Sequence, residues 1–360
     1  MAQLSNGAFT TLQEPKFSNA THLNGFFMGL EPARHDFIDW FNTHLAGKGT
    51  FAKRRINPDA NEDMAAVKRE FVEFWDSIPL VYKQPSITLF DFASLMCIAI
   101  NETGGRFRST TERCGRGAKD PSGIRHEGLA YAFDKIPKVK KSYNTLADAG
   151  NKTALECFSN PVFCAAHRGL GCSDRLSSPS MPDKVDPVWK GEVYPIDKFP
   201  FIEDIAETGF IMQADFYKFR GRGPFQITGR APYRKIVQYI QKYDGTSPVL
   251  LKFKERWKSL SADDACYASN DMDWDEIFSV KSVVALSLRT YADIASPSKN
   301  MLVMTNDLNR LNEETRTAGS IWSVGRIVSG TEKYANEEYK PRVVEMLEKI
   351  ASQRQAKQKI

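Results

Sequence analysis

The chain of 360 residues lacks the features that mark several specialised classes of protein. Its longest uninterrupted apolar run, residues 95–100, is far shorter than the roughly 20 residues that a bilayer requires, so the sequence predicts no transmembrane helix. Residues 1–7 contain neither the basic nor the apolar segment of a secretory signal peptide. The 23 glycines follow no triplet repeat, which excludes collagen. We therefore expect a soluble product made without a Sec signal.

The sequence has only a small excess of one sign of charge. Its 49 Lys and Arg residues exceed its 44 Asp and Glu residues by 5, which is less than most nucleic-acid-binding proteins show. A mild basic excess does suit contact with an anionic polymer. The hydrophobic share of 42% and the charged share of 26% exclude a wholly disordered chain, and the length fits one elaborated domain or two.

Motifs for metals and cofactors are also missing from the sequence. There is no H-E-x-x-H motif, and the histidines are scattered at His22, His35, His44, His126 and His167. Four of the six cysteines fall between residues 114 and 172, at spacings that do not match zinc sites. The sequence is equally compatible with disulfides formed after export and with reduced thiols at these positions. We predict no cofactor and no metal, and we expect Cys97 to be a buried structural thiol.

Apolar periodicity predicts a mainly α fold with a small β element. Helical spacing recurs over residues 62–78, where Pro79 is expected to end the helix, and over residues 88–101. Further helices are expected near residues 231–243, 276–294, 317–329 and 335–351. A tight turn and a short strand are expected around residues 225–228. Residues 113–215 are rich in Pro, Gly, Ser and Lys, and we interpret them as a long cysteine-containing insertion.

One carboxylate stands out at the end of the helix predicted over residues 88–101. Gly104 and Gly105 end that helix, so Glu102 lies in its last turn, beside an apolar face. Poor solvation there raises the pKa of a carboxyl group, as a general acid at neutral pH requires. Glu112 follows in a polar stretch, and two carboxylates in contrasting environments are the minimum for glycoside hydrolysis. The alternative is that both are solvated surface groups.

Two short segments carry a resemblance to a known family. Residues 102–105 read E-T-G-G, and residues 220–230 read R-G-R-G-P-F-Q-I-T-G-R. In this order they resemble the H-E-T-G-G and R-G-P-x-Q-L-T-G-R motifs of family-nineteen glycoside hydrolases, the lysozyme-like chitinases and related phage and bacterial peptidoglycan hydrolases. Residues 325–330 resemble the family's I-N-G-G segment. The resemblance implies a lysozyme-like α+β fold with a helical, bilobal core and a small β element beside the cleft. A plain β-turn is the alternative for residues 220–230.

The resemblance also implies roles for individual residues. Glu102 matches the general acid, and Glu112 matches a general base that activates water for attack with inversion. Gln226 matches a residue that hydrogen-bonds the N-acetylated sugar, and Thr228 a hydroxyl that holds the attacking water. The remaining matches are expected to line the substrate cleft, or in the case of the arginines to brace the loop: Tyr217, Arg222 and Arg230.

Two departures from the family pattern lie close to these matches. Asn101 takes the place of the His before the general acid, which affects how Glu102 is oriented. Ser329 takes the place of the substrate-binding Asn of I-N-G-G, which weakens the case for a chitinase-like subsite. Residues 81–360 are thus expected to form the catalytic domain, and residues 1–80 an N-terminal helical region that is a candidate docking or wall-binding part.

Together these observations predict a muramidase that cleaves the β-1,4 bond between N-acetylmuramic acid and N-acetylglucosamine. A chitinase and a non-catalytic glycan-binding protein on the same fold are the alternatives. We expect a monomer. Its expected partners are peptidoglycan strands and delivery machinery or an immunity protein, with no nucleic acid and no membrane insertion. The enzyme would act in the periplasm or cell wall after phage lysis or secretion.

Overall fold

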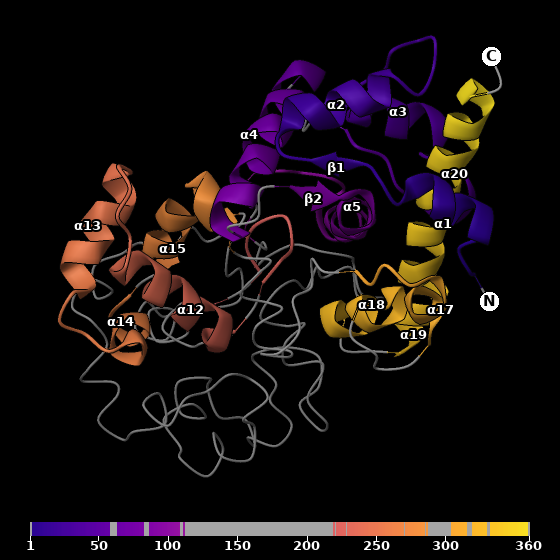
Figure 1. Cartoon of the computed structure of the whole chain (residues 1–360). Helices are drawn as coiled ribbons and strands as arrows, with labels where there is room; N and C mark the ends of the chain where they lie inside the picture. The colour runs from indigo at the N-terminus through magenta and orange to yellow at the C-terminus, as the bar shows by residue number, and fades with distance from the viewer. Residues whose placement is uncertain are drawn as a thin grey trace, which may run out of the picture. The chain divides into compact units, whose positions relative to one another are not determined.

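The computed structural model describes residues 2–57, 63–82, 86–108, 111, 219, 221–227, 229–269, 271–284, 286, 304–314, 319–329 and 332–358 (Figure 1). The chain divides into two compact units. Unit 1 comprises residues 1–110, 223–225 and 281–360, and unit 2 comprises residues 111–222 and 226–280. The described residues are mostly helical, which confirms the predicted mainly α class. None of the helices in these ranges is long and apolar enough to cross a membrane.

Unit 1 is built from helices around one small sheet. Its elements are α1 (Asn6–Leu12), β1 (Lys16–Phe17), α2 (Ala20–Met28), α3 (Phe37–His44), η1 (Gly49–Phe51), α4 (Met64–Tyr82), β2 (Ile87–Thr88), α5 (Leu89–Thr103), α17 (Leu308–Asn312), α18 (Ile321–Ser329), α19 (Glu332–Tyr334), η5 (Ala335–Tyr339) and α20 (Lys340–Gln358). The strands pair antiparallel, with Lys16 opposite Thr88 and Phe17 opposite Ile87. The sheet thus joins the N-terminal region to the start of α5.

Helix α5 is the central element of unit 1 and appears nearly end-on in Figure 1. It begins with a capping box at Thr88: the Asp91 backbone N–H donates to Thr88 Oγ1 at 3.1 Å, and Thr88 Oγ1 donates to Asp91 Oδ2 at 2.7 Å. Every residue from 89 to 100 is buried, including the Cys97 thiol, as predicted. Burial raises the pKa of Asp91 to about 7, and its Oδ1 accepts a hydrogen bond from the Met304 backbone N–H at 2.8 Å.

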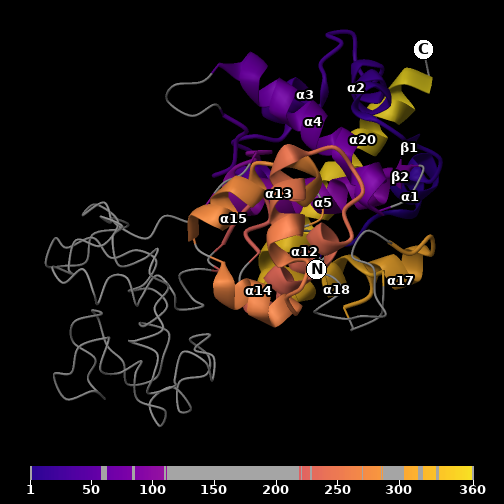
Figure 2. The same cartoon turned by 90° about the vertical axis from the view of Figure 1, so that its left-hand side faces the viewer.

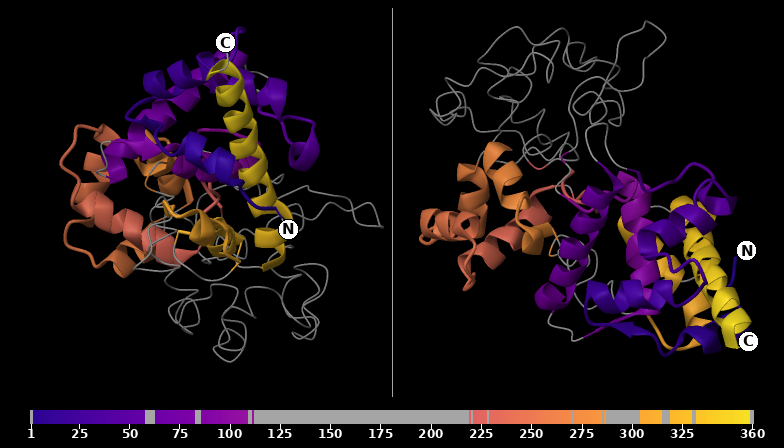
Figure 3. Two further views of the ribbon diagram at one scale, coloured as in Figure 1. Left: turned by 45° about the vertical axis from the view of Figure 1, so that its right-hand side comes forward. Right: turned by 90° about the horizontal axis from the view of Figure 1, so that it is seen from above.

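The core of unit 1 includes the N-terminal region. The Phe92 ring of α5 packs against aromatic rings from that region, with centroid distances of 6.1 Å to Phe17, 5.6 Å to Phe27 and 4.8 Å to Phe37. Helix α20 packs against α1 and α5, so the first and the last helix of the chain lie side by side (Figure 3, left). The division into units therefore does not follow the boundary expected near residue 80, because residues before and after it share one core.

Unit 2 contains α12 (Arg230–Gln241), α13 (Pro248–Trp257), α14 (Ala262–Ala268) and α15 (Asp271–Phe278), which are grouped in Figure 2. An aromatic cluster fills the space between them. The Trp274 ring lies 4.7 Å from the ring of Tyr233, 5.7 Å from that of Trp257 and 5.9 Å from that of Phe219. The Trp274 indole N–H donates to Ser269 Oγ at 2.8 Å, so its polar edge is satisfied inside the core.

Three sequence predictions need correction. Helix α4 does not end at Pro79 and continues to Tyr82. A proline has no backbone N–H and so removes one hydrogen bond of the helix, but the residues after it can keep a helical backbone. The helix expected over residues 276–294 is not continuous, since α15 ends at Phe278 in a turn and helix resumes at Lys281. The expected strand near residue 227 is a turn closed by an isolated bridge between Arg222 and Ile227. Helices α1–α3 were expected only in general, as part of a helical N-terminal region, and α13, α14 and α17 were not predicted.

Candidate active site around Glu102

The candidate active site is built on the C-terminal end of α5. Glu102 lies in the last turn, and Gly104 follows it with a left-handed backbone, φ +68°, as the sequence predicted. Residues 89–100 of α5 pack in the core of unit 1, while Glu102 is exposed to solvent. A rigid, buried helix therefore holds this carboxyl group at the surface, where it can meet a large substrate.

The neighbouring Asn101 orients the Glu102 carboxylate. Its amide nitrogen Nδ2 donates to Glu102 Oε1 at 2.9 Å. Its amide oxygen Oδ1 accepts from two arginines, from Arg54 Nη2 at 2.9 Å and from Arg342 Nη1 at 2.6 Å. Two cationic donors on one amide oxygen polarise the amide and strengthen its N–H as a donor to Glu102. Asn101 thus has a defined positioning contact with Glu102.

The two arginines come from opposite ends of the sequence. Arg54 lies in the short basic segment of residues 53–55 after η1, and Arg342 lies in the first turn of α20. Arg342 is 8% exposed and also donates through Nε to the Thr50 carbonyl oxygen at 3.3 Å. Glu345, one turn further along α20, accepts from the Thr50 backbone N–H at 2.8 Å. The site is therefore held by the packing of η1 against α20.

The surroundings of Glu102 raise the pKa of its carboxyl group. Burial is the largest influence and raises the pKa of the carboxyl group above its ordinary value. The Asn101 hydrogen bond and the charges of Arg54 and Arg342 lower this pKa, but they do not cancel the effect of burial, and Glu338 raises it further. A carboxyl group with a raised pKa and with solvent access has the properties of a general acid.

Two further side chains of unit 1 act on Glu102 and were not predicted. Glu338 accepts a hydrogen bond from Arg342 Nη2 at 3.0 Å and is half exposed. The Tyr334 phenol lies close enough for the Glu102 charge to raise its pKa, although burial is the larger cause. Both residues lie one or two turns before Arg342. For Glu338 the only signal in the sequence was its place in the helix predicted over residues 335–351, and Tyr334 lies just before that range.

The two glycines after Glu102 give a testable contrast. Both have positive φ, but a Cβ at Gly104 would meet open space, whereas one at Gly105 would lie 2.7 Å from Ile56 Cγ1. We expect Gly104→Ala to destabilise unit 1 by about 1 kcal/mol, from backbone strain alone, and Gly105→Ala by about 2–4 kcal/mol. Urea unfolding measures both. In an Ile56→Ala background the excess cost of Gly105→Ala should shrink, and equal costs in both backgrounds would contradict the contact.

The Gly-rich segment lies mostly in unit 2, and its Arg222 is fully buried there. Arg222 Nε donates to Asp275 Oδ1 at 2.9 Å and Nη1 donates to the Tyr233 hydroxyl at 3.1 Å. These contacts favour the bracing role for Arg222 over the cleft-lining role. Gln226 has φ +47° and is half-buried, and a Cβ at Gly221 would lie 2.6 Å from its Oε1. The glycine therefore makes room for the glutamine.

The other predicted site residues cannot be placed in the same way. Glu112, Tyr217 and Thr228 lie outside the described residues, as do the four cysteines between 114 and 172. Arg230 begins α12 and Ser329 ends α18, but their side chains are outside the description.

The chain was also compared with known proteins. No family model matches it. No curated protein and no solved structure matches it either. The family resemblance of the two motifs therefore stays a prediction, and any functional conclusion has to be drawn from the site itself.

Proposed function

We propose that this protein is a glycoside hydrolase that uses Glu102 as its general acid, with peptidoglycan as its substrate. One observation carries the proposal. Glu102 is a solvent-accessible carboxyl group with a raised pKa, fixed at the end of a buried helix by an amide that two arginines hold. The mainly α architecture is compatible with a lysozyme-like core, and the order of the E-T-G-G and Gly-rich motifs supports a family-nineteen relationship.

In the proposed mechanism Glu102 donates its proton to the glycosidic oxygen as the C1–O bond breaks. A second carboxylate takes a proton from water, and the water oxygen attacks the anomeric carbon from the opposite face, which inverts its configuration. The Asn101 amide remains bound to Glu102 Oε1 and accepts none of these protons. In this class of mechanism the two carboxyl groups are about 6.5–9.5 Å apart, which leaves room for the water.

Two residues are candidates for the second carboxylate. Glu112 is the candidate from the sequence pattern, ten residues after Glu102. Glu338 is the candidate from the structure, because its charge acts on Glu102 and Arg342 holds its carboxylate at 3.0 Å. Gln226 and Thr228 remain the proposed contacts for the N-acetyl group and the attacking water.

Peptidoglycan is favoured over chitin by the missing Asn at position 329, by the Glu102–Glu112 spacing and by the net charge of +5, which suits an anionic cell wall. In this proposal the protein acts on glycan strands in the periplasm or cell wall after phage lysis or secretion. Chitinase activity and non-catalytic glycan binding are the competing functions.

Digestion of purified sacculi by the full chain tests the proposal. Borohydride reduction followed by mass spectrometry identifies the sugar at the new reducing end. Fragments that end in reduced muramic acid are expected, and reduced glucosamine ends would make the enzyme a glucosaminidase. Release of fragments from chitin oligomers but not from sacculi would make it a chitinase. Binding to either polymer without any release of fragments would overturn the catalytic proposal.

Arg342 is expected to set the pH range of this activity. Its positive charge lowers the pKa of Glu102, and the general acid works only while protonated, so activity falls as the pH rises through that pKa. Arg342→Met should therefore shift the alkaline limb of kcat/KM to higher pH and also reduce kcat, since Asn101 loses one donor.

Arg342→Lys is the matched control for this prediction. Lysine keeps the positive charge but not the planar group that contacts Asn101, Glu338 and Thr50 together. The alkaline limb should then stay near its wild-type position while kcat falls. An alkaline limb of kcat/KM that shifts equally in Arg342→Met and Arg342→Lys would show that the Arg342 charge does not act on Glu102.

A further inference from the structure

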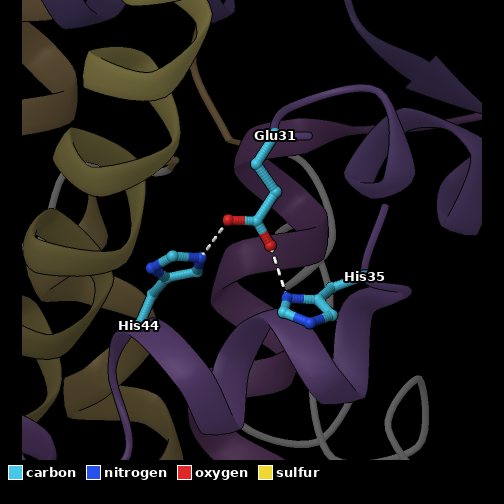
Figure 4. A group of neighbouring side chains, drawn as sticks. All are labelled: Glu31, His35 and His44. Carbon is cyan, nitrogen blue, oxygen red and sulfur yellow. Dashed lines mark hydrogen bonds and ion pairs between the residues drawn. The ribbon is translucent and has the colours of Figure 1, made fainter. Parts of the chain in front are cut away.

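A second cluster of ionisable side chains lies in the N-terminal part of unit 1. Glu31 follows α2, His35 lies in the loop before α3, and His44 is the last residue of α3. Figure 4 shows the Glu31 carboxylate between the two imidazole rings, with one oxygen directed at each. Glu31 Oε1 lies 2.5 Å from His35 Nδ1, and Glu31 Oε2 lies 2.5 Å from His44 Nε2. The fold thus joins histidines that are scattered in the sequence.

These three side chains are largely enclosed by protein. The exposed fractions are 12% for Glu31, 18% for His44 and 30% for His35. Glu31 Oε1 and His35 Nδ1 are both buried, and their 2.5 Å contact, an ion pair when His35 is protonated, does not have the geometry of a hydrogen bond. A buried polar atom without a hydrogen bond is costly and calls for a physical explanation, of which an unplaced ion is one.

We propose that Glu31, His35 and His44 bind a divalent first-row transition metal, with zinc as the ion to test. Two imidazole nitrogens and one carboxylate form a donor set typical of zinc sites that keep an open coordination position. Nitrogen donors select such metals over magnesium and calcium, which prefer oxygen. The three donor atoms lie within 4.8 Å of one another, so one ion can reach all of them.

The three donor atoms lie within 4.8 Å of one another and have to move to nearly equal separations to hold the ion. Zinc bonds of about 2.0–2.1 Å in a tetrahedron place neighbouring donors roughly 3.3 Å apart. The contacts of Glu31 with His35 and His44, at 2.5 Å, would each lengthen by roughly 0.8 Å, which side-chain rotation can provide. The metal would then lie between the carboxylate and the rings, and it would satisfy Glu31 Oε1 and His35 Nδ1 together.

One residue of α20 contacts the same ring nitrogen that the ion would use. The Trp40 indole N–H donates to Gln353 Oε1 at 2.6 Å, and Gln353 Nε2 lies 3.3 Å from His44 Nε2. An amide N–H can donate only to the lone pair of that nitrogen, so the Gln353 amide has to move away when the ion binds. A bound ion would link the loop after α2 to α3. It would stabilise unit 1 independently of any glycosidase activity.

Zinc titration of the full chain after removal of metal by a chelator tests this inference. We expect one zinc ion to bind per chain at this site, with a rise in Tm, since an ion that binds only the folded state stabilises it. Removing one direct ligand should raise Kd at least about 100-fold, because loss of even an outer-shell partner costs 10–100-fold. His35→Ala, His44→Ala and Glu31→Gln provide this test.

His22→Ala is the matched control, because His22 is exposed and contacts Ser18 Oγ through Nδ1 at 2.7 Å, away from the cluster. It should bind zinc as the wild type does. Cobalt substitution separates this site from the cysteines, since thiolate ligands give intense near-ultraviolet charge transfer and the proposed ligands do not. Circular dichroism checks that each variant is folded. No zinc binding by the wild type, or binding that the three ligand variants leave unchanged, would overturn the proposal.

Discussion

Glu102→Gln is expected to reduce kcat/KM on peptidoglycan by about 10²–10⁴-fold, the range that a positioned general acid contributes. The amide has the same shape as the carboxyl group but has no acidic proton to donate. Its oxygen can still accept the Asn101 Nδ2 hydrogen bond, which is 2.9 Å long in the wild type. The variant should therefore fold normally and bind the glycan with little change in KM. The measurement is the rate of release of reducing ends from sacculi.

Stability provides an independent check on the same substitution. Burial raises the folded-state pKa of Glu102, so the carboxyl group contributes most to stability below its unfolded-state pKa and loses that contribution as the pH rises through the folded value. Replacing it by a neutral amide should leave the free energy of unfolding at neutral pH unchanged or slightly higher. A Glu102→Gln protein that is inactive and also less stable would point to misfolding instead of a missing proton.

The second carboxylate is identified by comparing Glu112→Gln with Glu338→Gln under the same assay. If Glu112 is the base, its amide variant should be nearly inactive, while Glu338→Gln should only lower the pKa of Glu102 and shift the alkaline limb to lower pH. A nearly inactive Glu338→Gln beside an active Glu112→Gln would assign the role of general base to Glu338. Wild-type activity in both variants would remove the two-carboxylate mechanism.

The sequence predicted the Glu102 side of the site because local chemistry determines it. A capping box, a continuous apolar run and two glycines specify where α5 begins and ends, and therefore where Glu102 lies. The sequence pattern could not predict the long-range contacts of the site. Asn101 was noted only as a departure from a family pattern, yet it contacts Arg54 and Arg342, which are 47 and 241 residues away.

The cluster of Glu31, His35 and His44 and the division into units were not predicted, for a related reason. His35 and His44 have no recognisable metal spacing, and it is the turn between α2 and α3 that brings both to Glu31. Residues 1–80 were assigned to a region of their own because the family resemblance does not extend to them. Short helices with little periodicity, such as α1 and α2, are stabilised by tertiary packing, which the sequence pattern does not display.

Phe92→Ala is expected to cause the largest loss of stability in unit 1, about 3–5 kcal/mol, the usual cost of truncating a fully buried phenylalanine. The Phe92 ring has no exposed surface, and it contacts Phe17, Phe27 and Phe37 of the N-terminal region and Trp75 of α4. Removing it leaves a cavity that four aromatic side chains cannot easily fill. Chemical denaturation followed by tryptophan fluorescence and by circular dichroism measures the loss.

Two control variants connect this result to the organisation of the protein. Phe92→Leu keeps most of the volume and should cost less than about 1.5 kcal/mol. Phe26→Ala removes a ring from the same cluster, but Phe26 is only half-buried and its loss should cost less than that of Phe92. If residues 1–80 formed a separate wall-binding part, Phe92→Ala would unfold α5 and leave the N-terminal helices intact, giving two transitions. One shared transition is expected, because the rings of Phe17, Phe27 and Phe37 lose their common neighbour together. The N-terminal region would then be part of the scaffold that holds Glu102, and its removal would abolish activity by unfolding the site.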